Sequence, residues 1–364
     1  MDYIISGIQQ IGIGVSNADE AWAWYRKYFG MDIPIFAEAA EAALMLPYTG
    51  GAPRKRYAIL AINLQGGGGF EIWQYKSRTP QAATFELQLG DLGLFCAKIK
   101  CADVQKTYQF FKAEGVNLVS AIQQTPDGSD TFYLRDLYGN LFQIVPSQEW
   151  FQSPKRHLTG GAYGITIGVS DLERALPIYQ QLLGYDVIAY DKTQQFSDFQ
   201  ALPSGDHTFR RVLLRQTKAP VGAFAPVLGR SEIELVQALD RTPHKIYADR
   251  MWGDLGFIHL CFDVRNMDRI GAKAALLGQP FTVDSGASFD MGEAAGRFTY
   301  IEDPDGTLIE FVETHKVPIA KKWGWYLNLK NRQPDQALPR FIFKSTWLES
   351  KKIKLIALSA TYVT

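Results

Sequence analysis

The chain contains a long internal repeat. Residues 7–30, GIQQIGIGVSNADEAWAWYRKYFG, return 154 positions later as GAYGITIGVSDLERALPIYQQLLG. FEIWQYKSRTP and GDLGLFC return 163 positions later as IELVQALDRTP and GDLGFIH, and DLYGNLFQIV returns 167 positions later as DPDGTLIEFV. Chance similarity would not keep nearly constant offsets through separate segments, so we expect one half to be a duplicate of the other.

Each half divides again into two units of the same order. In the first unit, a strand leads to a helix that Ser16 or Asn17 can cap and that Gly30 can end in a left-handed conformation. The pattern predicts a βαβββ unit that occurs four times, at about 5–77, 88–150, 160–240 and 252–315. Pro177 lies inside the third helix and should kink it or remove one hydrogen bond.

Composition and charge exclude several classes of protein. Lys+Arg and Asp+Glu both number 38, so the basic excess typical of nucleic-acid binding is missing. No stretch of 18 apolar residues predicts a membrane span, and the N-terminus does not resemble a signal peptide. Three cysteines, Cys96, Cys101 and Cys261, do not form a disulfide framework. We therefore expect a cytoplasmic protein with a small-molecule substrate; a homodimer is left open.

The βαβββ unit, with its VSDLERA helix start and its closing DPDGTLIE strand, resembles the vicinal oxygen chelate superfamily. This group includes glyoxalase I, bleomycin resistance proteins and extradiol dioxygenases, and the resemblance covers residues 5–315. It implies an α+β fold in which the modules pair into two glyoxalase-like domains, whose curled mixed sheets form funnels. We expect an N-terminal domain at 1–150, a C-terminal domain at 151–315 and an extension at 316–364, with each pair of modules formed inside its own half.

The superfamily places metal ligands on the first and last strands of each unit. In the second half these positions hold Gly164, Glu234, His259 and Glu310, and in the first half they hold Gln10, Glu71, Cys96 and Gln143. The resemblance thus implies one divalent ion (Zn, Mn, Ni, Co or Fe) on Glu234, His259 and Glu310, with Gly164 leaving one position open. Glu234 or Glu310 would act as the catalytic proton carrier. The first half, with glutamines and a cysteine, is expected to be a degenerate scaffold.

The alternative for each of these side chains is structural. A histidine on a strand is commonly a satisfied core residue, and a buried glutamate commonly pairs with Arg or Lys. Three further residues are candidates for substrate binding, namely Arg211, Gln237 and Tyr300. For Arg211 and its neighbour Arg210, solvated charges at the end of a strand are the favoured alternative. The remaining histidines are expected outside the site.

The extension is basic and aromatic. Residues 316–364 hold ten Lys and Arg against two Asp and Glu, a net charge of +8, which leaves −8 on residues 1–315 because the whole chain is neutral. We expect this tail to pack against the acidic body, and an anionic membrane surface is the alternative.

Two classes of function remain. The first is a metal-dependent enzyme with lyase, isomerase or epimerase chemistry on a substrate chelated through neighbouring oxygens. Within that class, an extradiol-type ring-cleaving dioxygenase ranks second, because Gly164 supplies no ligand. The other class is a non-catalytic small-molecule binding or resistance protein that works without metal.

Overall fold

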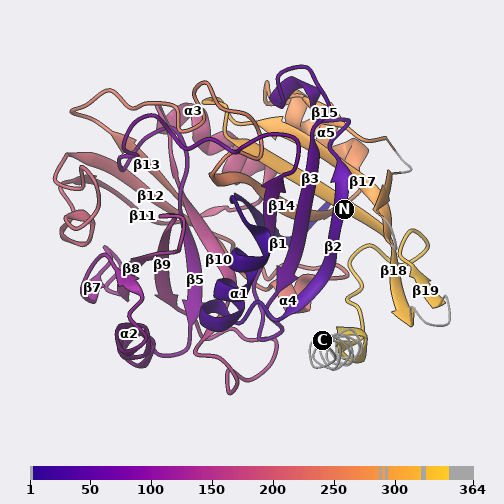
Figure 1. Cartoon of the computed structure of the whole chain (residues 1–364), viewed down its shortest axis with the longest axis horizontal. Coiled ribbons are helices and arrows are strands. Elements are labelled where there is room, and N and C mark those ends of the chain that lie inside the picture. The colour runs from indigo at the N-terminus through magenta and orange to yellow at the C-terminus, as the bar shows by residue number, and fades with distance from the viewer. Residues whose placement is uncertain (1–2, 287–288, 292–293, 321–324, 344–364) are drawn as a thin grey trace, which may run out of the picture.

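The computed structural model describes residues 3–286, 289–291, 294–320 and 325–343 (Figure 1). The first two modules follow each other along the chain. The elements of module 1 are β1 (Ile4–Gly14), α1 (Ala18–Phe29), β2 (Ile33–Glu41), a 3₁₀ turn (Leu46–Tyr48), β3 (Lys55–Ile62) and β4 (Gly69–Tyr75). Those of module 2 are β5 (Gly93–Cys101), α2 (Val104–Ala113), β6 (Asn117–Leu118), β7 (Gln123–Gln124), β8 (Asp130–Arg135) and β9 (Leu141–Pro146).

The second half repeats this order. The elements of module 3 are β10 (Thr159–Gly168), α3 (Leu172–Pro177), a π-helical turn (Ile178–Leu182), β11 (Val187–Gln194), a 3₁₀ turn (Ser197–Phe199), β12 (Phe209–Arg215), α4 (Ala225–Leu228) and β13 (Glu232–Ala238). Those of module 4 are β14 (Gly256–Arg265), α5 (Met267–Leu276), β15 (Val283–Asp284), β16 (Phe289–Met291), β17 (Ala294–Glu302) and β18 (Leu308–Ala320), followed by β19 (Trp325–Asn328). The expected start of the extension, residue 316, therefore falls inside β18.

The two halves share the same internal geometry, which confirms the duplication. Glu71 on β4 pairs with Gly12 on β1, and Glu234 on β13 pairs with Thr166 on β10 in the matching register. A buried hydrogen bond also recurs, from Tyr25 to Asp136 in the first half and from Tyr179 to Asp303 in the second. Local signals behave as expected: Asn17 caps α1, and Gly30 has a φ of 63°. Pro177 marks the point where α3 gives way to the π-helical turn.

The modules pair across the halves rather than within them, so the expected pairing is wrong. In the described residues, one sheet has the order β15-β17-β18-β14-β1-β4-β3-β2 and joins modules 1 and 4. The other has the order β11-β12-β13-β10-β5-β9-β8-β6 and joins modules 2 and 3. Figure 1 shows the indigo strands of module 1 beside the orange strands of module 4. We call these sheet A and sheet B.

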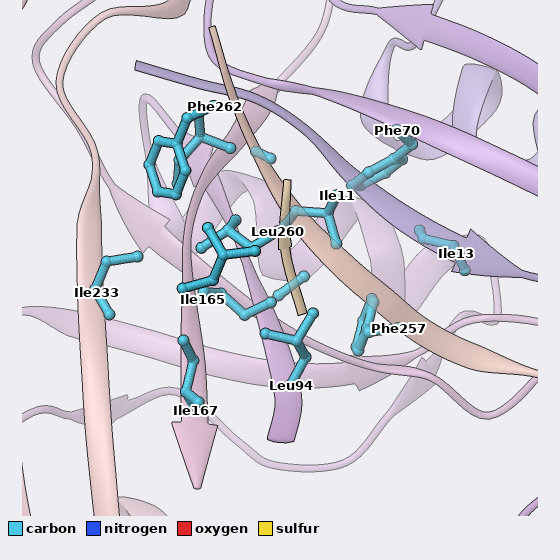
Figure 2. Packing of buried hydrophobic residues seen from close by; sticks show 14 of the residues in the cluster. Ile11, Ile13, Phe70, Leu94, Ile165, Ile167, Ile233, Phe257, Leu260 and Phe262 are labelled. Atoms are coloured by element: carbon cyan, nitrogen blue, oxygen red, sulfur yellow. The ribbon is translucent and has the colours of Figure 1, made fainter. Parts of the chain in front are cut away.

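The main apolar core lies between the two sheets. Figure 2 shows Ile11 and Leu260 from the centre of sheet A packed near Ile165 and Leu94 from the centre of sheet B. Tyr25 and Phe29 of α1 belong to the same buried cluster, as do residues of α3 and α5. This packing leaves the opposite face of each sheet free to form a funnel, and a smaller cluster of aromatic and apolar side chains fills part of each one.

The described part of the tail packs on the body through apolar contacts. Leu329, Leu338, Ile342 and Phe343 are buried in one cluster with Phe151 and residues of the β12–β13 connection. The backbone N–H of Leu338 also donates to the carbonyl of Ala223. Residues 329–343 thus pack on the body as expected, through apolar contacts, whereas residues 321–324 and 344–364 of the tail lie outside the described residues. Among the described residues, no helix has the length and apolarity needed to cross a lipid bilayer.

Candidate metal centre

The pairing of modules 1 and 4 brings four of the eight ligand positions together. Strands β18, β14, β1 and β4 are neighbours in sheet A, and they carry Glu310, His259, Gln10 and Glu71 respectively. Gly12 is in register with both His259 and Glu71, and Cys261 with both Gln10 and Glu310. Because alternate residues of a strand share a face, the four side chains lie on one face of the sheet.

Their polar atoms converge on one point. One ligand atom from each of Glu71, His259 and Glu310 lies within 4.8 Å of the others. His259 Nε2 is 3.1 Å from Glu310 Oε2 and 3.3 Å from Glu71 Oε2. The amide of Gln10 lies 3.5 Å from Glu71 Oε2 and 3.4 Å from Glu310 Oε2.

The electrostatics of this cluster require a cation. Burial lowers the pKa of His259, but Glu310 and then Glu71 act more strongly in the other direction and raise it to about 9. Burial raises the pKa of Glu71, but contact with the His259 ring outweighs this, so the pKa ends below its usual value. Without another cation, the imidazolium therefore supplies the positive charge between the two carboxylates.

The residues fit a divalent ion. Neither ring nitrogen of His259 makes a hydrogen bond with good geometry in the described part of the chain, although two carboxylate oxygens are close. Gln10 Oε1 also has no partner there, and exchanging the two ends of this amide would point an oxygen into the cluster. One imidazole, two carboxylates and an amide oxygen form a mixed N/O donor set that suits Zn, Mn, Ni, Co or Fe.

Two residues that sequence reasoning missed shape the centre. A Cβ atom at Gly12 would lie 2.4 Å from His259 Cε1, so the ring occupies space that only glycine leaves. The repeat contained this signal, because Thr166 is the residue that matches Gly12. Trp252, in the connection before β14, stacks on the His259 ring at a centroid distance of 6.1 Å. Tyr300 meets the same ring edge-on at 5.6 Å.

Trp252 also lines a cavity of about 420 Å³. Ile258 and Leu308 line it, and they are near neighbours of His259 and Glu310 on the same strands. The side chains of Glu71 and Glu310 are 11 % and 9 % exposed, whereas that of His259 is fully buried. The two glutamate side chains are therefore slightly more exposed than the His259 ring, although all three residues are buried.

Comparison with known proteins identifies the family. The model of the glyoxalase/bleomycin resistance protein/dioxygenase superfamily matches residues 7–144 and 161–311. The chain belongs to this superfamily. Glyoxalase I from Zea mays has a similar fold, with a TM-score of 0.54 at 12 % identity over 84 % of this chain and 92 % of that one. A Bacillus subtilis subsp. subtilis strain 168 protein, described as a candidate dioxygenase, gives 0.55 at 13 % identity over 85 % of each chain. No curated protein matches the sequence.

Glu234 is not part of the candidate centre in sheet A, which corrects the expected set of three. It lies fully buried in sheet B, in hydrogen-bonding contact with Arg211 and Tyr190 and 3.0 Å from Lys98 Nζ. Burial raises the pKa of Glu234, but Arg211 and Lys98 lower it far below its usual range. The reason is the crossed pairing, because module 3 meets module 2 and not module 4.

The other ligand positions in sheet B differ from those of sheet A. Gly164 pairs with Glu232, Cys96 belongs to an apolar cluster, and the buried amide of Gln143 has no hydrogen-bond partner among the described residues. The expectation that the whole first half is a degenerate scaffold is therefore wrong. Its Gln10 and Glu71 join the candidate centre, and only its Cys96 and Gln143 fall in the sheet without the cluster.

The three residues expected to bind substrate lie in different parts of the structure. Tyr300 borders the centre, and burial followed by Glu310 and Glu71 raises its pKa. Arg211 is fully buried and pairs with Asp198 as well as Glu234, so it is not a solvated strand end. Gln237 bonds to the backbone of Ser170 and Leu172 at the start of α3, a structural role.

The remaining histidines lie away from the cluster, as expected. His157 contacts Asp32, His207 contacts Asp240, and His315 lies 3.7 Å from Glu313. His244 is exposed and packs against Phe85.

Proposed function

We propose that this protein is a metal-dependent enzyme that isomerises, epimerises or cleaves a small organic substrate bound through two neighbouring oxygens. The observation that carries the proposal is the convergence of Gln10, Glu71, His259 and Glu310 on one point in sheet A. Membership of the glyoxalase superfamily supports it at the level of the fold.

In this proposal Gln10, Glu71, His259 and Glu310 hold one divalent ion. Such an ion polarises a carbonyl oxygen and stabilises the negative charge that develops when a neighbouring carbon loses a proton. His259 supplies its neutral imidazole to the site, so it gives up its own proton when the site is loaded. Gly12 and Trp252 fix the plane of the ring from two sides.

The two glutamates are the candidates for moving the proton. The side chains of Glu71 and Glu310 are 11 % and 9 % exposed, whereas that of His259 is fully buried. In this proposal one of the two carboxylates takes a proton from one carbon of the substrate and returns it to the neighbouring carbon. Glu71 and Glu310 thus take the catalytic role that was expected of Glu234 and Glu310.

The donor set favours this chemistry over extradiol ring cleavage. Non-haem iron oxygenases use two histidines and one carboxylate. The sheet A cluster holds one histidine and two carboxylates, and the other four histidines lie elsewhere in the described structure.

The test is metal retention followed by an activity assay. The chelator-treated protein is loaded separately with Zn, Mn, Ni, Co and Fe, and bound metal is measured by elemental analysis. We expect one ion per chain in the wild type, and at least about 100-fold weaker retention in His259→Ala and Glu71→Gln. His244→Ala, which removes an exposed histidine, is the matched control and should retain the metal.

The loaded protein is then assayed with 2-oxoaldehydes, 2-hydroxyketones and catechols. Turnover of the first two classes without oxygen uptake supports the proposal. Oxygen uptake with catechols would support the dioxygenase instead. If the wild type retains no ion from any of the five metals, the enzyme proposal fails and a metal-free binding protein takes its place.

A further inference from the structure

We propose that a cavity on sheet B, beside Lys100, is a second ligand site, which binds a small organic monocarboxylate with an apolar body and holds its carboxylate on the Lys100 ammonium. The cavity measures about 330 Å³ and lies in the opposite sheet from the candidate metal centre. The proposal does not depend on the function proposed above.

Strand β5 carries two buried lysines on one face. Lys98 and Lys100 are two residues apart, so their side chains point to the same side of sheet B. Each is only 2 % exposed. A buried ammonium is costly unless a charge partner compensates it, so each lysine needs an explanation.

Lys98 has its partners within the protein. Its Nζ lies 2.8 Å from Glu232 Oε1 and 3.0 Å from Glu234 Oε2. Burial lowers the pKa of Lys98, but these two carboxylates outweigh it, and the pKa is raised. This lysine is fully compensated.

Lys100 has no such partner. Its Nζ donates to the carbonyl oxygen of Glu149 at 2.9 Å, and no carboxylate in the described residues lies within ion-pair distance. The Glu149 carboxylate is engaged by Arg230, at 3.0 Å. Burial consequently lowers the pKa of Lys100 to about 8, with Glu149 opposing the shift only in part. The ammonium keeps two N–H groups for an acceptor that the described residues do not supply.

The walls of the cavity come from segments that the repeat does not contain. The β12–β13 connection, residues 216–231, is longer than the matching β3–β4 connection, residues 63–68, and forms one wall with α4. The linker after β9 and two tail residues, Asp335 and Ala337, complete it. The duplicated framework does not need these additions, and together they enclose the uncompensated lysine.

The chemistry of the walls selects the ligand. Trp150, Phe151, Pro220 and Pro226 make them largely apolar, and the Lys100 ammonium lies 5.0 Å from the Trp150 ring centre. Arg230 also lines the cavity, but its charge is paired with Glu149. The exposed Asp335 would repel a second negative charge on the ligand. A cavity of this size suits a small molecule. A single carboxylate on an apolar body matches one buried ammonium between such walls.

The experiment measures binding of 3-phenylpropanoate, hexanoate, benzoate and butanoate to the full chain by isothermal titration calorimetry. The neutral isostere 3-phenylpropanamide tests the role of charge. Lys100→Met removes the ammonium and keeps the length of the side chain. Lys218→Met removes an exposed lysine next to the cavity wall and is the matched control. Val221→Trp fills the mouth at a position that is 40 % exposed, and it keeps the test valid if Lys100→Met does not fold.

We expect at least one carboxylate to bind the wild type and Lys218→Met with dissociation constants within about twofold of each other. Binding should weaken at least about tenfold in Lys100→Met and in Val221→Trp, and the amide should bind the wild type at least about tenfold more weakly than its acid. The proposal is overturned if no carboxylate of the panel binds at up to about 10 mM. Equal binding by Lys100→Met, or equal binding of the amide and the acid, would also overturn it.

Discussion

Glu71 and Glu234 occupy matching positions of the repeat and face the same physical problem, a carboxylate buried on the face of a sheet. In sheet A the neighbours of Glu71 are His259 and a second carboxylate, so the positive charge must be completed by a proton or an ion. In sheet B the chain itself supplies Arg211 and Lys98. Glu71 can therefore accept an external cation, whereas the charge of Glu234 is already compensated by Arg211 and Lys98.

Substitutions of the two glutamates should have different effects on stability and on metal retention. Glu234→Gln leaves Arg211 and Lys98 short of one negative charge, and we expect it to lower the free energy of unfolding by about 3 kcal/mol or more while metal retention persists. Glu71→Gln should change stability by about 1 kcal/mol at most and abolish metal retention. Urea denaturation and elemental analysis on the same preparations check both. The reverse outcome, with metal lost only in Glu234→Gln, would restore the set predicted from the sequence.

Gly12 offers a second test at a single residue. The change Gly12→Thr installs the residue that the other half carries at position 166, and its Cβ would occupy the space of the His259 ring. We expect the ring to be displaced and metal affinity to fall at least about 100-fold. The reciprocal change, Thr166→Gly, removes a hydrogen bond to Glu234 and should cost about 1 kcal/mol without affecting the metal. Unchanged metal content in Gly12→Thr would argue against the proposed centre.

The lowered pKa of Lys100 should make the free energy of unfolding depend on pH in the alkaline range. Its pKa falls from about 10.5 in the unfolded chain to about 8 in the folded one, so the folded state holds its proton less tightly. Below pH 8 both states are protonated and the full cost of the buried charge is present; above about pH 10.5 both are neutral and the cost is gone. Lys100→Met should therefore stabilise the protein by up to about 3 kcal/mol at pH 7, and this gain should shrink as the pH rises from 8 to 10. Denaturation curves at pH 7, 8.5 and 10 measure it; a gain that stays constant with pH would contradict the assignment.

At the level of elements, the sequence predicted the strands and helix of each module, but it did not predict which modules pair with each other. Strand and helix order, the Asn17 cap, the Gly30 end and the break at Pro177 follow from local rules that act within a few residues. Which module pairs with which depends on contacts between strands far apart in the chain. The central strands β1 and β10 are both almost entirely buried. The hydrophobic pattern alone therefore does not determine which strand pairs with each of them.

The same limit explains how far the site could be predicted. His259 and Glu310 were found because they lie in one module, where spacing fixes their relation. Glu71 and Gln10 had been identified as ligand positions but were assigned to the wrong centre, since that assignment rested on the pairing. Trp252 carried no signal at all, because its role comes from a connection whose path only the structure reveals.

At the scale of the whole molecule, the crossed pairing makes the two halves dependent on each other. If residues 1–155 and 156–364 are produced separately, two inner strands of each half lose their antiparallel partners: β1 and β5 in the first half, and β10 and β14 in the second. We expect neither half to unfold cooperatively alone, and a mixture of the two to recover both the fold and metal binding, because Gln10 and Glu71 come from one half and His259 and Glu310 from the other. Size-exclusion chromatography and metal titration check this. A folded, monomeric N-terminal half would contradict the interlocked arrangement.

The tail should behave as part of the body. A chain that ends at residue 324 keeps β18 but loses Leu329, Leu338, Ile342 and Phe343, which uncovers Phe151 and the apolar side of the β12–β13 connection. We expect lower solubility, dye binding to the exposed surface and a fall in the free energy of unfolding of several kcal/mol. A chain that ends at Phe343 keeps all these contacts and is the matched comparison. Equal solubility and stability of the two truncated chains would show that the packing contributes little.

The crossed order of the sheets also has a consequence during synthesis. Strand β1 leaves the ribosome some 240 residues before its partner β14, a delay of roughly 10–50 s at about 5–20 residues per second. During that interval the edge of β1 that pairs with β14 in the folded protein has no partner, while modules 2 and 3 are being synthesised. Gln10 and Glu310 are 300 residues apart in the chain, so the candidate centre can form only after Glu310 has been synthesised. A ribosome that stops early in this message would release fragments that cannot hold an ion at this place.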